Sequence, residues 1–535
     1  MTLASVPPLA RRRLPALLAL AVAVGLSLAY LRWSPLSPDL AAQVARTDVV
    51  RKAGLSSWWT GWFGGLSMPS YSVVAPTWMS VLGVRKTGAL ATVVGAVGAA
   101  RLLRTAPRPR AGAAAFAVSA AADLLVGRIT FIVGVALAVW ALDALRTRRM
   151  ILGVPLAIGC YFASPLAGLF LGMVCVAVAL TDCDRRRMAI GQAAMLLAVG
   201  GAMTVLFPGT GTMPFDVRSA LIPAGGCTAV ALACRQPVVR VVSALAFATT
   251  LALAFAPGAV GSNITRLAWI AAAPIVVACA SLPRRRLIAV VALVAAWPVA
   301  DTANQLTKAA TPSASAAYYR PLAAELDAER AAIGASAIGQ RLEVVDTSNH
   351  WPSVYLAGRS LARGWDRQAD YADNPIFYSS GALTTASYQR WLLQLAVGWV
   401  ALPDASLDFA ATDEGTLVRR QPRYLRRVWS NAHWTLYRVE PSAPLVTGAT
   451  VRSVTDASIV LSTSASATVR TRVRYSPYLR AVDPATRQPV DSCVTDDGGW
   501  LTLYLPRAST VALTSDFTVL KRLSDADCRG KPASG

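Results

Sequence analysis

Acidic side chains are the scarcest groups able to do acid–base chemistry in the first 301 residues of this chain. That stretch contains no glutamate and eight aspartates. Four aspartates are expected to be structural, because three lie beside arginine clusters and one ends the last long apolar run. These four are Asp143, Asp182, Asp184 and Asp301. The others are candidates for proton transfer or metal binding, since a carboxylate is ionised at neutral pH. They are Asp39, Asp48, Asp123 and Asp216.

Asp39 is the strongest of these candidates. Ser37-Pro38-Asp39 has the pattern of a helix start, with Ser37 as N-cap and Pro38 at the first helical position. On that helix Asp39, Gln43 and Arg46 recur at i, i+4 and i+7, which places them on one polar stripe. The stripe predicts a general base, Asp39, beside two side chains able to bind a substrate. The alternative is that Asp39 only interacts favourably with the helix macrodipole.

Two of the other aspartates have simpler structural explanations. Asp48 lies about half a turn round the same helix. It has Arg51 and Lys52 at i+3 and i+4, the spacing of surface ion pairs. Asp216 precedes an apolar segment that it can cap. We therefore expect local roles for both.

Asp123 and two arginines complete the set of candidate polar residues. Asp123 lies near the end of an apolar segment, with Arg128 at the following turn. An acid within a membrane helix predicts a function by default, although a structural Asp123–Arg128 pair is an open alternative. Arg266, in GSNITRL, lies at another helix start, where its guanidinium can bind a phosphate or a lipid headgroup. Asp123, Arg128 and Arg266 are therefore candidates for substrate binding.

Three tryptophans follow the predicted helix of Asp39. Trp58, Trp59 and Trp62 precede Gly64-Gly65, a pattern that favours a loop packing beside a sugar ring or a lipid. Membership of an interfacial aromatic belt is the alternative.

Membrane helices must position these residues. The chain has 535 residues, of which 54% are hydrophobic and only 15% charged. Apolar runs near the length needed to cross a bilayer recur up to about residue 300. The pattern predicts eleven spans, near residues 14–31, 87–103, 112–127, 129–145, 150–163, 165–181, 188–207, 217–234, 238–256, 265–282 and 286–302. A further run at 70–84 would break the charge alternation, so we expect an interfacial or re-entrant helix there.

The distribution of arginine predicts the topology. The net charge of +23 comes from short basic clusters between apolar runs, which is typical of a membrane protein and argues against a nucleic-acid partner. If these clusters are cytoplasmic, eleven spans place the N-terminus inside and the tail outside. We expect the plasma (inner) membrane of a bacterium, with the bilayer as the first partner.

The tail is expected to contain two folded domains. Residues 306–441 mix helical patches with short strands, as in a small α/β domain. Residues 442–535 alternate polar and β-branched residues between turn signals, which favours an antiparallel β-sandwich. Residues 1–305 would form the membrane domain, with a first outer loop at 32–86. Cys493 and Cys528 are the two cysteines of the tail, and an extracytoplasmic location predicts a disulfide between them.

The first outer loop resembles that of a known superfamily. Asp39 early in a short helix, the run Trp58–Gly65 (WWTGWFGG), a Tyr/Pro segment with Tyr71 and Pro76, and Asp123 are similar to the GT-C superfamily. These are polytopic glycosyltransferases that use polyprenyl-phosphate sugars at the outer membrane face. The resemblance implies that Asp39 is the base, Asp123 a second acidic or metal-site residue, and Arg266 a phosphate contact. It also implies that a divalent metal, Mg or Mn, is sometimes required.

The tail resembles that of actinobacterial integral membrane proteins through LARGWDRQADYADNPIFY and VWSNAHWTLYRVE. The first motif holds Trp365, Asp366, Arg367 and Tyr371, which can line a sugar-binding surface or form a packing turn. The resemblances together favour a membrane glycosyltransferase acting on a cell-envelope glycan or lipid acceptor. A non-catalytic scaffold or glycan-binding membrane protein is the alternative. A transporter is disfavoured, because it should carry deep acids or broken helices in paired halves.

Overall fold

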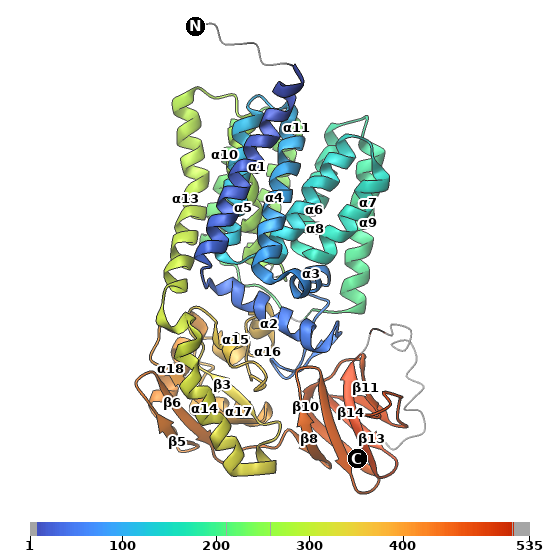
Figure 1. Cartoon of the computed structure of the whole chain (residues 1–535), viewed down its shortest axis with the longest axis vertical. Helices are drawn as coiled ribbons and strands as arrows, with labels where there is room; N and C mark the ends of the chain where they lie inside the picture. The colour runs from blue at the N-terminus through green and yellow to red at the C-terminus, as the bar shows by residue number, and fades with distance from the viewer. Residues whose placement is uncertain (1–7, 210, 257, 516, 518–535) are drawn as a thin grey trace. The chain divides into compact units, whose positions relative to one another are not determined.

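The computed structural model describes residues 8–209, 211–256, 258–515 and 517 (Figure 1). The chain forms two compact units. The helical unit holds the described residues up to Gln43, then Tyr71–Val205 and Thr212–Ala310. The β-rich unit holds Val44–Ser70, Leu206–Gly211 and the described residues from Thr311 onward. Residues 44–70 therefore belong with the tail, whereas the whole first outer loop was expected in the membrane domain.

The helical unit consists of helices joined mostly by short turns. In chain order they are α1 Pro8–Trp33, α2 Pro38–Ala53, α3 Val74–Leu82, α4 Val84–Leu102, α5 Pro109–Val126, α6 Ile129–Arg146, α7 Met150–Ala163, α8 Pro165–Thr181, α9 Arg186–Leu206, α10 Val217–Ala233, α11 Pro237–Phe255, α12 Thr265–Cys279 and α13 Arg284–Ala309. The boundary between the two units falls within α2, after Gln43. Each of the eleven predicted spans coincides with a helix, and the ambiguous run at 70–84 contains α3, a helix of nine residues.

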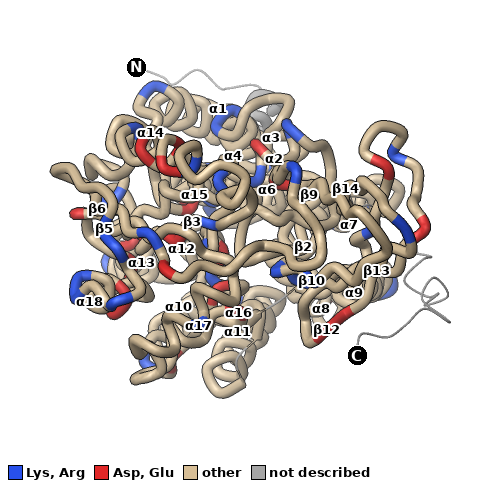
Figure 2. Tube along the Cα trace, turned by 90° about the horizontal axis from the view of Figure 1, so that it is seen from below, with Lys and Arg blue, Asp and Glu red and all other residues tan. Residues whose placement is uncertain are grey.

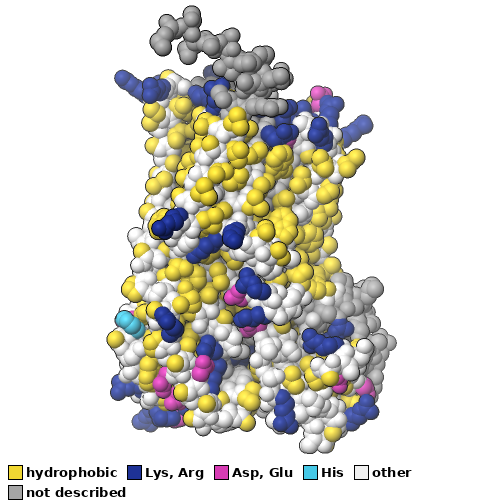
Figure 3. Space-filling view, in the orientation of Figure 1, with side chains coloured by type: hydrophobic (Ala, Val, Ile, Leu, Met, Phe, Trp, Pro, Cys, Tyr) yellow, Lys and Arg dark blue, Asp and Glu magenta, His cyan; other side chains and the backbone are white. Residues whose placement is uncertain are grey.

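Length and composition identify the helical unit as a multi-pass membrane unit. Among the described residues, eight helical segments are long and apolar enough to cross a membrane, and three shorter apolar helices, α7, α8 and α10, accompany them. Hydrophobic side chains cover the sides of the helices, whereas Lys and Arg gather at the end where α4 and α6 finish (Figure 3). The total of eleven spans stays a prediction.

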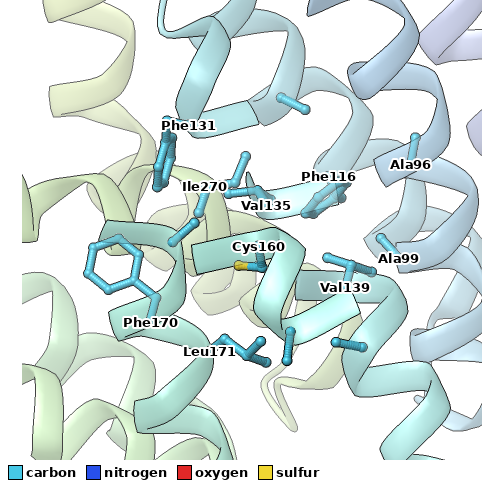
Figure 4. Packing of buried hydrophobic residues seen from close by; sticks show 14 of the residues in the cluster. Ala96, Ala99, Phe116, Phe131, Val135, Val139, Cys160, Phe170, Leu171 and Ile270 are labelled. Carbon is cyan, nitrogen blue, oxygen red and sulfur yellow. The ribbon is translucent and has the colours of Figure 1, made fainter. Parts of the chain in front are cut away.

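Small side chains allow the membrane helices to approach closely. The largest apolar cluster of this unit includes many buried alanines, such as Ala96 and Ala99, together with larger side chains from α5, α6 and α8 (Figure 4). A Cβ atom added at Gly134 would lie 2.7 Å from the Cβ of Ala167. Within a bilayer, such small residues let backbones pack at short range, which is how membrane helices associate.

The β-rich unit combines a mixed sheet with a β-sandwich. The mixed sheet has the order β3-β4-β6-β5, with β3 and β4 parallel and the other pairs antiparallel. Its strands are β3 Arg341–Val344, β4 Val397–Pro403, β5 Leu425–Ser430 and β6 Trp434–Val439. The helices of this region are α14 Ala316–Ile333, α15 Pro352–Tyr355, α16 Arg367–Asp373, α17 Thr385–Gln394 and α18 Thr412–Arg419. This is the α/β fold expected for the first part of the tail.

The sandwich contains two antiparallel sheets, ordered β12-β13-β10-β7 and β11-β14-β9-β8. Leu461 and Val511 of one sheet share a buried cluster with Val469 and Leu503 of the other, so the two sheets enclose one core. The strands are β7 Val446–Thr447, β8 Thr450–Val454, β9 Ser458–Thr463, β10 Ala467–Arg474, β11 Leu479–Val482, β12 Cys493–Asp497, β13 Trp500–Leu505 and β14 Ser509–Ser515. Cys528 lies outside the described residues, so the Cys493–Cys528 disulfide stays a prediction.

Charged residues are distributed differently along the two units. Most of the 29 acidic residues follow position 301, and Figure 2 shows acidic and basic positions interspersed along the β-rich unit. A surface of mixed charge is typical of a folded domain in water.

Candidate functional site

The site in the helical unit begins with the first turn of α2. This helix starts at Pro38 and has Asp39 in its first turn, as the sequence predicts. The Oγ atom of Ser37 is buried and makes no hydrogen bond to the described residues, so it does not cap the helix. Pro38, whose φ is fixed at a helical value, is therefore the better explanation of where α2 begins.

Gly127 allows this first turn to lie against the turn between α5 and α6. Gly127 ends α5 with a φ of 88°, in the left-handed region. A Cβ atom at this position would lie 2.4 Å from the backbone nitrogen of Leu40. Only glycine accommodates both the backbone conformation and the close approach, so Gly127 determines how near Asp39 comes to Arg128.

Arg128 is shared by three carboxylates from distant parts of the chain. Its Nε lies 3.3 Å from Oδ2 of Asp39, its Nη1 3.2 Å from Oδ1 of Asp123, and its Nη2 3.1 Å from Oδ2 of Asp301. The guanidinium carbon lies 4.3 Å from the ring centroid of Trp269. A planar fork with five N–H donors suits this arrangement, which a lysine could not reproduce.

The three carboxylates differ in exposure. The side chain of Asp123 is fully buried, whereas those of Asp301 and Asp39 are 17% and 29% exposed. Asp39 is therefore the carboxylate of this cluster that an incoming hydroxyl group can reach best. Asp123 is buried in its pair with Arg128, and its role in substrate binding stays a prediction.

Arg266 supplies a second cation beside Asp39. Its Nη2 lies 3.8 Å from Oδ2 of Asp39, and its guanidinium carbon lies 5.9 Å from the ring centroid of Phe131. The guanidinium donates no hydrogen bond to the described residues. Its N–H groups are thus available to an anionic ligand. We refer to Asp39, Asp123, Arg128, Arg266 and Asp301 as the membrane charge cluster.

The polar stripe of α2 is divided between the two units. Gln43 lies in the helical unit, where its Nε2 donates to the hydroxyl oxygen of Tyr71 over 2.9 Å. Arg46 lies in the β-rich unit, where its Nη2 donates to Oδ2 of Asp366 over 2.5 Å. Arg46 is buried, and its guanidinium carbon is 5.8 Å from the ring centroid of Trp62. Arg46 thus packs within the β-rich unit, and the substrate contact expected from the stripe stays a prediction.

The three tryptophans are also packing residues of the β-rich unit. Trp58, Trp59 and Trp62 are 9%, 2% and 1% exposed. Trp58 joins the core of the sandwich, and Trp59 and Trp62 lie 4.2 Å apart between ring centroids. Backbone hydrogen bonds join this segment to the tail, for example from Leu361 to Gly61. Because the three rings are buried, their faces are not free to contact a sugar or a membrane interface.

The remaining aspartates of residues 1–301 mostly have local partners. Asp48 pairs with Arg51 at 2.8 Å, and Asp216 caps α10 by accepting from the backbone nitrogen of Ser219. Asp301 is the exception, because the sequence suggested only that it ended the last span. Helix α13 continues to Ala309, and Asp301 joins the membrane charge cluster from within it. An acid inside an apolar helix was the signal that could have identified it.

The membrane charge cluster does not fit the divalent metal implied by the resemblance. The carboxylates that would bind it, Asp39, Asp123 and Asp301, already surround the guanidinium of Arg128. Among the described residues, no group of three or more His, Cys, Asp or Glu side chains is arranged to hold a metal ion. The positive charge at the centre of these carboxylates is supplied by the chain itself.

The tail motif LARGWDRQADYADNPIFY forms a second arginine-centred cluster, in the β-rich unit. Arg363 donates to Asp370 over 2.7 Å and to Glu414 over 3.1 Å, and it lies 3.9 Å from Glu343. Burial raises the pKa of Glu414 to about 7, and burial together with Glu414 raises the pKa of Glu343 well above its usual value. Although burial acts in the opposite direction, Arg363 holds the pKa of Asp370 below its usual value. We call this group the tail charge cluster.

The contacts of the same motif do not favour the sugar-binding surface that the sequence left open. The ring of Trp365 stacks on His350 at 3.4 Å between centroids. Arg367 donates to both carboxylate oxygens of Asp408, at 2.9 and 2.8 Å. Asp366 caps α16 and pairs with Arg46. These contacts describe the packing turn that was the alternative interpretation.

A solved structure is similar to this chain. No family model matches the chain, and no curated protein matches it. Among solved structures, a cryo-EM structure of a mutant of arabinofuranosyltransferase AftD from Mycobacteria matches with 14% sequence identity and a TM-score of 0.44. The match covers 94% of this chain and 60% of that chain, so the present chain spans about 60% of that enzyme's length. By its name the matched protein is a glycosyltransferase.

Proposed function

We propose that this chain is a membrane glycosyltransferase that transfers a sugar from a polyprenyl-phosphate donor to a cell-envelope glycan or lipid acceptor. The observation that carries the proposal is the position of Asp39. It is the most exposed carboxylate of the membrane charge cluster, and it lies beside two guanidinium groups, of which Arg266 has unused N–H donors. Transfer from a lipid phosphate requires these two functions, a proton acceptor and a cation for the leaving phosphate.

The proposed step assigns one role to each side chain. The acceptor hydroxyl oxygen attacks the anomeric carbon of the donor sugar, and its proton passes to the carboxylate of Asp39. The bond between the anomeric carbon and the phosphate oxygen breaks, and its electron pair leaves with the polyprenyl phosphate. Arg266 donates hydrogen bonds to the departing phosphate, while Arg128 holds Asp39 in place. No step requires a metal ion.

The proposed location follows from the arginine clusters. If the basic end of the helical unit is cytoplasmic, the N-terminus of the chain lies inside and the β-rich unit lies outside the plasma membrane. Asp39 and Arg266, at the opposite ends of the spans from these clusters, then act at the outer face. Alkaline phosphatase fused after Lys308 should be active, and a fusion near Arg186 should be inactive.

A matched pair of variants tests the assignment. Asp39→Asn keeps the shape of the side chain but removes its ability to accept a proton. In a deletion strain complemented with this variant, the lipid-linked and envelope glycan products should fall about 10²–10⁴-fold, the usual contribution of a positioned base. Asp48→Asn removes the same charge from the same helix, but Asp48 belongs to an exposed ion pair. This variant should leave the amount of product unchanged.

Protein level and membrane insertion should be equal for the two variants. If both variants make normal product, or if Asp39→Asn only lowers protein level, Asp39 is structural. The chain is then better described as a non-catalytic envelope scaffold.

A further inference from the structure

A cavity of about 690 Å³ lies among the helices of the helical unit. Its wall comes from α4, α5, α6, α8, α10, α11 and α12, and most of it is apolar. Phe116, Val139, Phe170 and Leu171 are among its lining residues, and Figure 4 shows them on neighbouring helices. A hydrocarbon ligand fits such a wall, because apolar side chains make up most of it and polar ones such as Ser243 and Thr250 are few.

The three charged side chains of the lining gather at one end, together with the amide of Gln236. Arg146 ends α6, Asp182 follows α8, Arg185 precedes α9, and Gln236 precedes α11. This is the basic end of the helical unit seen in Figure 3. Arg266 and Cys279 lie near opposite ends of α12, and Cys279 lines the cavity. The charged rim is therefore at the other end of the helices from the membrane charge cluster.

The two arginines of the rim are neighbours with unused donors. Arg185 donates through Nε to the backbone oxygen of Arg146 over 3.1 Å and through Nη1 to Asp182 over 2.5 Å. Arg146 donates through Nη2 to Asp143 over 2.6 Å. The Nη1 group of Arg146 and the Nη2 group of Arg185 make no hydrogen bond to the described residues. Arg185, bonded to the backbone oxygen of Arg146, and Arg146 itself thus offer free N–H groups that suit a phosphate, and basic pockets between membrane helices bind lipid headgroups.

The length of the cavity matches a single lipid chain. On α12 its lining runs from Leu267 to Cys279, which corresponds to about 18 Å at the rise of an α-helix. On α6 it runs from Val135 to Arg146, about 16 Å. Each leaflet contributes about half of the roughly 30 Å hydrocarbon thickness of a bilayer. One acyl chain entering at the rim can therefore be enclosed along its length.

We propose that this cavity binds one acyl chain of an anionic phospholipid from the leaflet at the basic end, with its phosphate held by Arg146 and Arg185. The charged rim lies at the other end of α12 from the membrane charge cluster, and the proposal does not depend on the proposed glycosyl transfer. Its ligand is a resident lipid that fills space between the helices.

The test uses full-length protein extracted with its surrounding lipids and examined by native mass spectrometry. The wild-type protein should retain a phospholipid after detergent exchange, with a preference of at least ten-fold for phosphatidylglycerol over phosphatidylcholine in mixed micelles. Ala246→Phe, which adds a ring at a lining position on α11, should abolish retention. Ala248→Phe adds the same ring at an exposed position of the same helix and should not change retention.

A second variant tests the headgroup contact without filling the cavity. Arg185→Gln should reduce the preference for phosphatidylglycerol while the acyl chain still binds. The proposal is overturned if the wild-type protein retains no lipid, or if Ala246→Phe and Ala248→Phe retain it equally. It is also overturned if the retained molecule is polyprenyl phosphate, or if Arg185→Gln leaves the preference intact.

Discussion

The membrane charge cluster and the tail charge cluster have nearly the same composition. Each places one arginine among three carboxylates drawn from distant positions in the chain. They differ in exposure. The side chains of Asp39 and Asp301 are 29% and 17% exposed, whereas Asp370, Glu414 and Glu343 are 6% exposed or less. The buried tail charge cluster, which we call the sealed cluster, can only stabilise the fold of its unit. The partly exposed membrane charge cluster, which we call the open cluster, can also exchange a proton with a ligand.

Replacement of the arginine at the centre of each cluster is expected to give the largest difference between the two clusters. Arg363→Met leaves three buried acids without their cation, and such a loss typically destabilises by about 3–5 kcal/mol. We expect the β-rich unit to lose resistance to proteolysis. Arg128→Met leaves Asp39 and Asp301 able to hydrate, so we expect loss of glycan product with a smaller loss of stability. Limited proteolysis and product analysis of both variants measure the contrast, and equal destabilisation would contradict it.

Gly127 tests how strictly the open cluster is positioned. Gly127→Ala adds a Cβ atom at 2.4 Å from the nitrogen of Leu40 and strains a left-handed residue. The first turn of α2 must move, so product formation should fall at least ten-fold. Gly83→Ala is the matched control, because Gly83 also has positive φ but no atom within 4 Å of the added Cβ. If the two variants form product equally, the close approach at Leu40 does not position Asp39.

The smallest expected effect is a pH dependence of stability, which arises in the sealed cluster. Glu414 has a pKa of about 7 in the folded chain and about 4.5 when unfolded, so the folded state binds more protons between these values. Its contribution to stability is fully present below about pH 4.5 and is lost as the pH rises to about 7. Hydrogen exchange of β4 and β6 should therefore be slower at pH 5 than at pH 8, after correction for the intrinsic rate.

Substitution of the glutamate separates this effect from other titrations. Glu414→Gln should reduce the difference between pH 5 and pH 8, whereas Glu440→Gln, at a more exposed ion pair, should preserve it. An unchanged difference in Glu414→Gln would remove the sealed cluster as its source. Asp373, whose pKa burial raises to about 6, would then be the next candidate.

Local patterns in the sequence predicted the elements well. Apolar runs located every membrane helix, and alternation located strands such as β9 and β13. The start of α2 at Pro38 followed from the proline at the first helical position, although Ser37 does not cap the helix as expected. These features depend on neighbours within one or two turns, which is why a single sequence contains them.

Features that depend on distant partners were harder to predict. Asp301 lies 173 positions from Arg128, and only the fold brings the two together. Trp58 and its neighbours have the residue types of a binding loop, but the same rings suit a core. Their partners in the tail decide between the two. Arg46 was placed correctly on its helix, yet its ion pair with Asp366 spans 320 positions.

The alanine-rich contacts between membrane helices have a consequence for conformational entropy. In a bilayer, leaving the lipid gains little for an apolar side chain, so only modest dispersion forces hold the helices together. A long side chain would offset this gain by losing rotamers on packing, whereas alanine and glycine have none to lose. Ala96 against its neighbours, and Gly134 against Ala167, therefore order two backbones with almost no side-chain entropy lost.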